Sequence, residues 1–133
     1  MNIWMKSSAF FCAAAMLVAL PAMAHHSIAG EYFMDQRTTV EGELVQFLYR
    51  NPHSFVEVKA KDPHTGNIVT WNVEWNGAGR LGRENINAET LRPGDHVVVS
   101  GQPSRTADDH RLHMVTISRP SDGWKWSRSR QAY

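Results

Sequence analysis

The sequence predicts a mainly β protein: a small five-stranded, OB-like Greek-key barrel with a short helical segment before the fourth strand. Three observations lead to this fold class. Several segments alternate apolar and polar residues, as strands with one buried face do. Turn signals separate these segments at regular intervals, and the one glycine-rich stretch, 76–91, lies between the third strand-like segment and the fourth. Another small barrel or a two-sheet sandwich is the alternative architecture.

The first predicted strand, residues 38–49, is long and bent. Val40 and Leu44 share one face, but the apolar residues that follow, Val45 and Phe47, fall in the opposite phase. A change of phase near a glycine indicates a β-bulge or a sharp bend. We therefore expect this strand to bend near its middle.

The next two strands, predicted at 55–61 and 69–75, form a hairpin. Arg50-Asn51-Pro52 precedes it as a turn, because proline fixes φ and lacks an N–H donor. The connecting segment 62–67 is rich in turn-forming residues. Strict alternation implies one buried face and one wetter face. The buried face is predicted to hold Val56, Val58, Ala60, Val69, Trp71, Val73 and Trp75.

The second half of the domain is predicted to add a helical segment and two strands. The stretch 76–91 is expected to carry a short helix or two helical turns. Arg92-Pro93-Gly94-Asp95 is a strong turn signal. A fourth strand at 96–101 and a fifth at 111–119 follow it, joined by a loop at 102–109.

The first 24 residues have the organisation of a cleavable signal peptide. The apolar run 9–20 is shorter than a membrane span, and Ala22-Met23-Ala24 fits the small-x-small rule for cleavage. Cleavage there makes His25 the first residue of an exported, periplasmic chain without a transmembrane segment. The remaining parts are a leading segment at 25–37, the barrel at 38–119 and a polar C-terminal tail at 120–133.

Charge and cysteine content exclude several functional classes. Lys and Arg together number 14, and Asp and Glu number 13, so there is no basic surplus of the kind that nucleic-acid binding needs. The single cysteine, Cys12, lies within the predicted signal peptide, so the exported chain has no disulfide, thiolate nucleophile or cysteine metal ligand. No phosphate loop or nucleophile elbow is present. We therefore expect a non-enzymatic protein.

Four short motifs follow one another along the chain: His25-His26-Ser27, Asn51-Pro52-His53-Ser54, Trp71-Asn72-Val73-Glu74 and Leu91-Arg92-Pro93-Gly94-Asp95. As an ordered set they resemble an exported bacterial family catalogued as domain of unknown function 6152. The resemblance implies secretion and a small β domain, and it implies no reaction. His110, His113 and the tryptophan-rich tail are not part of it.

The expected N-terminus supplies a metal-binding group. A free α-amine ionises at roughly pKa 7.7–8.0, so the amine and the ring Nδ1 of His25 can chelate one ion together. A third nitrogen from a distant histidine would complete the T-shaped site called a histidine brace. His53, beside a turn fixed by Pro52, is the first candidate for that nitrogen, and His26 is the second. Nitrogen ligands of this kind suit copper first and zinc second.

Three functions therefore remain open. The first is a non-catalytic periplasmic protein that binds copper through His25 with His53 or His26. The second is a metal-free envelope adaptor of the OB type, with a protein or glycan partner. The third is a copper-dependent oxidase, which needs a substrate surface that the sequence does not reveal. The histidines also have a plain alternative, in which His25-His26 is a polar start and His53 caps a turn.

Overall fold

The computed structural model describes residues 28–106 and 108–129. The predicted signal peptide, His25 and His26 lie outside the described residues. The described elements are α1 (Ile28–Glu31), β1 (Thr38–Leu48), β2 (His53–Lys61), β3 (Ile68–Asn76), α2 (Ala78–Arg83), β4 (His96–Pro103), β5 (Arg111–Arg119) and β6 (Trp124–Ser127). Within these ranges no helix has the length and apolar character needed to cross a bilayer.

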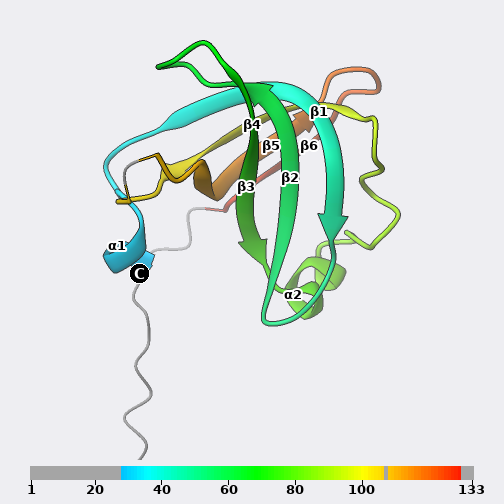
Figure 1. Cartoon of the computed structure of the whole chain (residues 1–133). Helices are drawn as coiled ribbons and strands as arrows, with labels where there is room; N and C mark the ends of the chain where they lie inside the picture. Colours follow the sequence, from blue (N-terminus) through cyan, green and yellow to red (C-terminus); the bar gives the residue numbers. More distant parts are fainter. Residues whose placement is uncertain (1–27, 107, 130–133) are drawn as a thin grey trace, which may run out of the picture.

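Five strands close into the predicted Greek-key barrel (Figure 1). The sheet order is β3-β2-β1-β4-β5-β6, and an additional parallel pairing of β3 with β5 closes the sheet on itself. Closure matters because an unpaired strand edge is a template for association with other chains. The predicted helical segment is α2, which Figure 1 shows at the end of the barrel where β1 ends and β2 begins.

β1 bends at a β-bulge, as its change of phase predicts. Its register with β2 shifts between Leu44 and Gln46. Val45 is the extra residue and is exposed, whereas Leu44 is fully buried. Gly42 serves a different purpose, because a Cβ there would lie 2.1 Å from the carbonyl oxygen of Lys59 on β2. The glycine therefore permits the close approach of the two strands.

The barrel core is built from the apolar faces that the alternation predicts. Burying an aliphatic side chain of this kind stabilises a fold by roughly 1.5–3 kcal/mol. The segment that holds α2 also contributes to the core, through Leu81, Ile86 and Leu91. The strands contribute Val40, Leu44, Val56, Val58, Ala60, Trp71, Val73, Trp75, Val97, Val99, Leu112, Met114 and Ile117.

Two segments outside the predicted barrel also pack onto it. The leading segment contains α1 and then Tyr32, whose side chain is 1% exposed. The segment expected to be a polar tail contains β6, which pairs antiparallel with β5. Trp126 of β6 packs edge-on against Trp75, with ring centroids 5.0 Å apart. An indole ring gains much free energy from burial, which explains why this otherwise polar segment joins the sheet.

Candidate functional site

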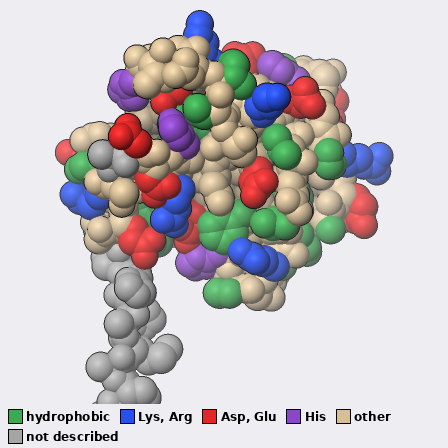
Figure 2. All heavy atoms as spheres, viewed as in Figure 1, with side chains coloured by type: hydrophobic (Ala, Val, Ile, Leu, Met, Phe, Trp, Pro, Cys, Tyr) green, Lys and Arg blue, Asp and Glu red, His purple; other side chains and the backbone are tan. Residues whose placement is uncertain are grey.

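The charged side chains do not by themselves mark a site. The face shown in Figure 2 mixes acidic and basic groups without a large area of one sign. Exposed charges distributed in this way are largely screened at physiological ionic strength. The candidate site therefore has to be identified from local geometry.

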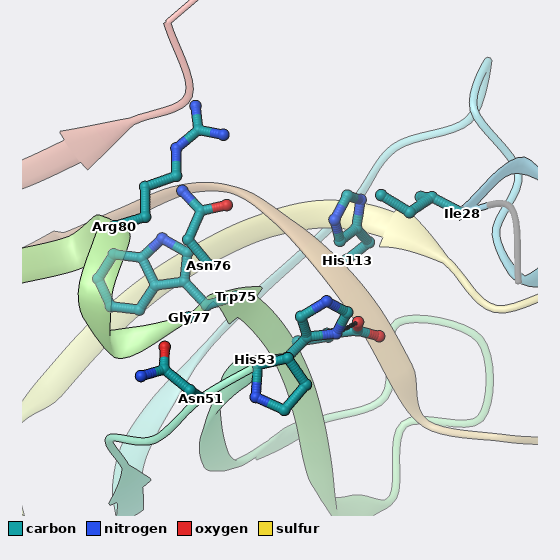
Figure 3. A pocket seen from close by; sticks show the side chains of 10 residues that line it. Ile28, Asn51, His53, Trp75, Asn76, Gly77, Arg80 and His113 are labelled. Atoms are coloured by element: carbon teal, nitrogen blue, oxygen red, sulfur yellow. Dashed lines mark ion pairs between the residues drawn. The ribbon is translucent and has the colours of Figure 1, made fainter. Parts of the chain in front are cut away.

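A pocket of about 300 Å³ lies where β2 begins and β3 ends (Figure 3). It contains His53, which is the predicted metal ligand that falls within the described residues. The lining consists of Ile28, Asn51, Pro52, His53, Glu74, Trp75, Asn76, Gly77, Arg80 and His113. Segments that are distant in the sequence thus meet at this one end of the hairpin.

A turn that is held by hydrogen bonds positions His53. The Ser54 hydroxyl donates to the carbonyl oxygen of Arg50 at 3.1 Å, and the Arg50 N–H donates to the same hydroxyl at 3.2 Å. The side-chain oxygen of Asn51 accepts a hydrogen bond of 3.1 Å from the Gly79 N–H. β2 begins at His53 itself, two residues earlier than predicted, so the histidine is held by strand pairing as well as by the turn.

His53 is paired with a buried carboxylate. Its Nδ1 forms an ion pair with Oε1 of Glu74, which is 7% exposed. The Tyr32 hydroxyl donates to Oε2 of Glu74 at 2.6 Å, and Nη2 of Arg111 lies 3.7 Å from that oxygen. A buried charge needs such partners because its loss of hydration is costly. Glu74 alternates with Val73 and Trp75 of the predicted buried face, so the sequence predicts it on the wetter face of its strand, but Tyr32 covers it.

Tyr32 acts as a permanent donor in this cluster. Burial, together with the hydrogen bond to Glu74 and its negative charge, raises the pKa of Tyr32 far above its usual range. Arg111 donates to the phenol oxygen at 3.0 Å. The hydroxyl therefore keeps its proton at neutral pH and directs it to Glu74, which keeps the carboxylate oriented toward His53.

This arrangement leaves the other ring nitrogen of His53 available. With Nδ1 facing Glu74, Nε2 lies on the opposite side of the ring, and the side chain is 51% exposed. Proteins commonly orient a metal-binding histidine in this way, with one nitrogen held by a carboxylate and the other presented to the ion. His53 is therefore suited to bind an ion or a ligand group through Nε2.

His113 lines the same pocket but is held differently. Its ring is 7% exposed, stacks on Tyr32 and places Nδ1 3.0 Å from Oε1 of Gln102. Nη2 of Arg128 lies 3.1 Å from its Nε2. Burial, assisted by the Arg128 charge, lowers the pKa of His113 to about 4. The ring is neutral at pH 7, but the adjacent guanidinium disfavours a second cation beside it.

The described residues do not form a complete metal site on their own. In residues 28–106 and 108–129, no three His, Cys, Asp or Glu side chains converge in a way that could hold a metal ion. An ion bound by His53 would need ligands from outside these ranges. Ile28, where the described chain begins, lines the pocket beside His113 (Figure 3).

Sequence reasoning missed most of the groups that support His53. Tyr32 and Glu74 are 42 residues apart, and Tyr32 and Arg111 are 79 apart. No local pattern links positions at such separations. The position of Glu74 in a strand directly opposite the turn that carries His53 was the available signal, because hairpin partners lie side by side.

A second pocket of about 310 Å³ lies at the other end of the β2–β3 hairpin. There Nε2 of His110 is 2.8 Å from Oδ2 of Asp62. The other oxygen of Asp62 accepts backbone hydrogen bonds of 2.7 Å from His64 and 3.2 Å from Thr65. The bond from His64 is the main reason that the pKa of Asp62 is lowered. Asp62 thus stabilises the hairpin loop through these backbone hydrogen bonds.

The chain matches a sequence family rather than a protein with an assigned activity. The model of a family of unknown function, DUF6152, matches residues 14–113. No curated protein and no solved structure matches the chain. The matched range includes His25, His53 and Glu74, and it ends before β6.

Proposed function

Because this chain belongs to the family of unknown function DUF6152, whose description names no activity, we propose from the site geometry that it binds a copper ion. The α-amine and ring of His25 and the Nε2 of His53 are the proposed ligands. The protein would do so without catalysis, as an exported protein of the periplasm. The observation that supports this most is the orientation of His53, which is held through Nδ1 by the buried Glu74 and exposed on its other side.

The distance along the chain from His25 to the pocket fits this proposal. Three extended residues span roughly 10 Å. Ile28 lines the pocket, so a segment of three residues is long enough to join the pocket to an amine at position 25. His26, one residue nearer, is the substitute ligand. The proposal requires cleavage after Ala24, because only a free amine can join the ring in a chelate.

The donor set favours copper over other ions. Amine and imidazole nitrogens suit Cu(II), which heads the affinity order of divalent first-row metals. Zinc is the second choice, because three nitrogens with one open position are also a zinc arrangement. The carboxylate of Glu74 fixes the orientation of the His53 ring as a ligand through its contact with Nδ1.

The test is calorimetric titration of Cu(II) into four forms of the protein. The form that begins at His25 is expected to bind one ion tightly. One alanine added before His25, or His53→Ala, should each weaken binding by more than about 100-fold, because a lost ligand costs more than a lost supporting partner. His110→Ala is the matched control, since His110 also pairs with a carboxylate.

Each result has a clear meaning. Equal affinity in the extended form would remove the amine from the site, and unchanged affinity in His53→Ala would remove His53. Mass spectrometry of the exported protein, with and without added copper, reports the cleavage site and the bound ion together.

A metal-free envelope module is the second candidate function. It is favoured by the two pockets, about 300 and 310 Å³, which have the size of the smallest ligand sites in proteins. This candidate predicts that copper and zinc leave the melting temperature unchanged and that a protein or glycan partner co-purifies with the chain.

A further inference from the structure

The pocket has a second end, which is separate from His53. Figure 3 shows Trp75, Asn76 and Arg80 on one side of it, and His113 and Ile28 on the other. Nε1 of Trp75 and Nδ2 of Asn76 are both buried and have no hydrogen-bond partner in the described part of the chain. Trp75 is 2% exposed. Two adjacent residues that line this end of the pocket thus have side-chain N–H donors without a partner.

Unused donors of this kind need an explanation. A buried N–H without a partner loses its hydration and gains nothing in return, so native proteins leave few of them. Where such groups line a pocket, a ligand that accepts hydrogen bonds is the simplest partner. The two donors therefore indicate what the ligand must offer, which is acceptor atoms.

Arg80 adds positive charge to the same end of the pocket. Its side chain is 49% exposed, and its Nε lies 3.6 Å from Oε1 of Glu84, which compensates part of the charge. Glu84 is also engaged by the indole N–H of Trp126. The negative charge of Glu74 lies toward the other end, where Tyr32 and Arg111 contact it. Arg80 and the two unpartnered donors therefore belong to residues that line the same end of the pocket.

We propose that this end of the pocket binds the carboxylate of a small organic acid. The carboxylate group offers two acceptor oxygens and one negative charge, which match two N–H donors and a guanidinium. Pro52 and Ile28, which also line the pocket, provide apolar surface for the rest of the molecule. A volume of about 300 Å³ limits the ligand to a small acid. This inference does not depend on copper binding.

Benzoate is the probe for this site, and benzamide is its neutral control of the same shape. Titrations use the full exported protein with a metal chelator present, so that the outcome is independent of the copper proposal. We expect saturable benzoate binding in the millimolar range with one site per chain. Benzamide should bind at least about tenfold more weakly, because it lacks the charge that strengthens these hydrogen bonds.

Matched variants locate the binding site. Arg80→Gln should weaken benzoate binding by about tenfold, the size expected for one charge-assisted hydrogen bond. Arg83→Gln lies on the same helix, is exposed and does not line the pocket, so it should bind as the wild type does.

Substitutions of the two donors sharpen the result. Asn76→Asp replaces a donor by a like charge and should abolish benzoate binding. Trp75→Phe keeps an aromatic ring and removes the indole N–H, so it tests that donor alone. Trp71→Phe is its control, because Trp71 has the same unpartnered N–H but lines the other pocket. If Asn76→Asp does not fold, the exposed Arg80 variant still decides. Absence of saturation, equal binding of benzamide, or equal effects of Arg80→Gln and Arg83→Gln would each overturn the proposal.

Discussion

The two ends of the β2–β3 hairpin carry the same pair of residue types in different settings. At one end His53 pairs with Glu74, and at the other His110 pairs with Asp62. Glu74 is contacted by Tyr32 and Arg111, which come from distant parts of the chain, whereas Asp62 accepts hydrogen bonds from its own loop. The remaining contacts of the carboxylate, rather than the pair itself, decide what the histidine can do.

The exposure of the two histidines leads to the same distinction. His110 is 31% exposed, and the ring of Trp71 packs edge-on against it with centroids 5.1 Å apart. His53 is 51% exposed. The His110–Asp62 pair therefore stabilises a loop and packs against the Trp71 ring. The His53–Glu74 pair presents a ring nitrogen of His53 at the mouth of a pocket.

Exchanging each carboxylate for its amide gives the largest expected contrast between the two ends. Glu74→Gln should weaken Cu(II) binding by roughly 10–100-fold, because the amide no longer orients His53 with a negative charge. Asp62→Asn should leave the affinity unchanged. Calorimetric titration of both variants, each starting at His25, measures the difference. Equal losses would show that the two pairs do not differ in the way proposed.

The sequence predicts the parts of this comparison that are local. Alternation predicts the five barrel strands, and Pro52 predicts a rigid turn at His53. The burial of Glu74 could not be predicted, because it depends on Tyr32 packing over it from 42 residues away. A strand pattern specifies which face a side chain is on, but it does not specify what covers that face.

β6 illustrates a different limit of sequence analysis. Residues 124–127 alternate tryptophan with polar residues, but the stretch is short and lies within a charged segment. β3 pairs only with residues 111–113 of β5, so residues 116–119 of β5 remain available for pairing with β6. Trp126 then packs against Trp75. Neither fact is encoded locally. Two tryptophans in a polar tail were the available signal that the segment packs onto the barrel.

His113 extends the comparison to a third histidine, which is buried and neutral. Its pKa in the folded protein is about 4, below the usual value of 6.5, so the unfolded chain takes up the proton first as pH falls. Its contribution to stability is therefore complete above pH 6.5 and is lost between pH 6.5 and 4. Allowing for partial solvent screening, we expect a loss of about 2 kcal/mol.

Denaturant unfolding at several pH values tests this expectation. In the wild type, the free energy of unfolding should fall across the window from pH 6.5 to 4. In His113→Gln the fall should be smaller by that amount, whereas His64→Gln, an exposed loop histidine, should follow the wild type. A wild-type slope that survives in His113→Gln would assign the pH dependence to other groups.

The smallest expected effect concerns the hairpin loop that Asp62 stabilises. Asp62→Asn should lower the melting temperature by a few degrees at pH 7, because an amide oxygen accepts the backbone hydrogen bonds of His64 and Thr65 less strongly than a carboxylate. The pKa of Asp62 is lowered in the folded state, so its contribution is complete above the unfolded value of about 3.9 and is lost as pH falls through the lower folded value. Melting curves of the wild type and Asp62→Asn should therefore converge in acid, while Asp35→Asn, which alters an exposed side chain, should match the wild type throughout. An Asp62→Asn protein that keeps its melting temperature and loses copper affinity would reverse the roles assigned to the two ends of the hairpin.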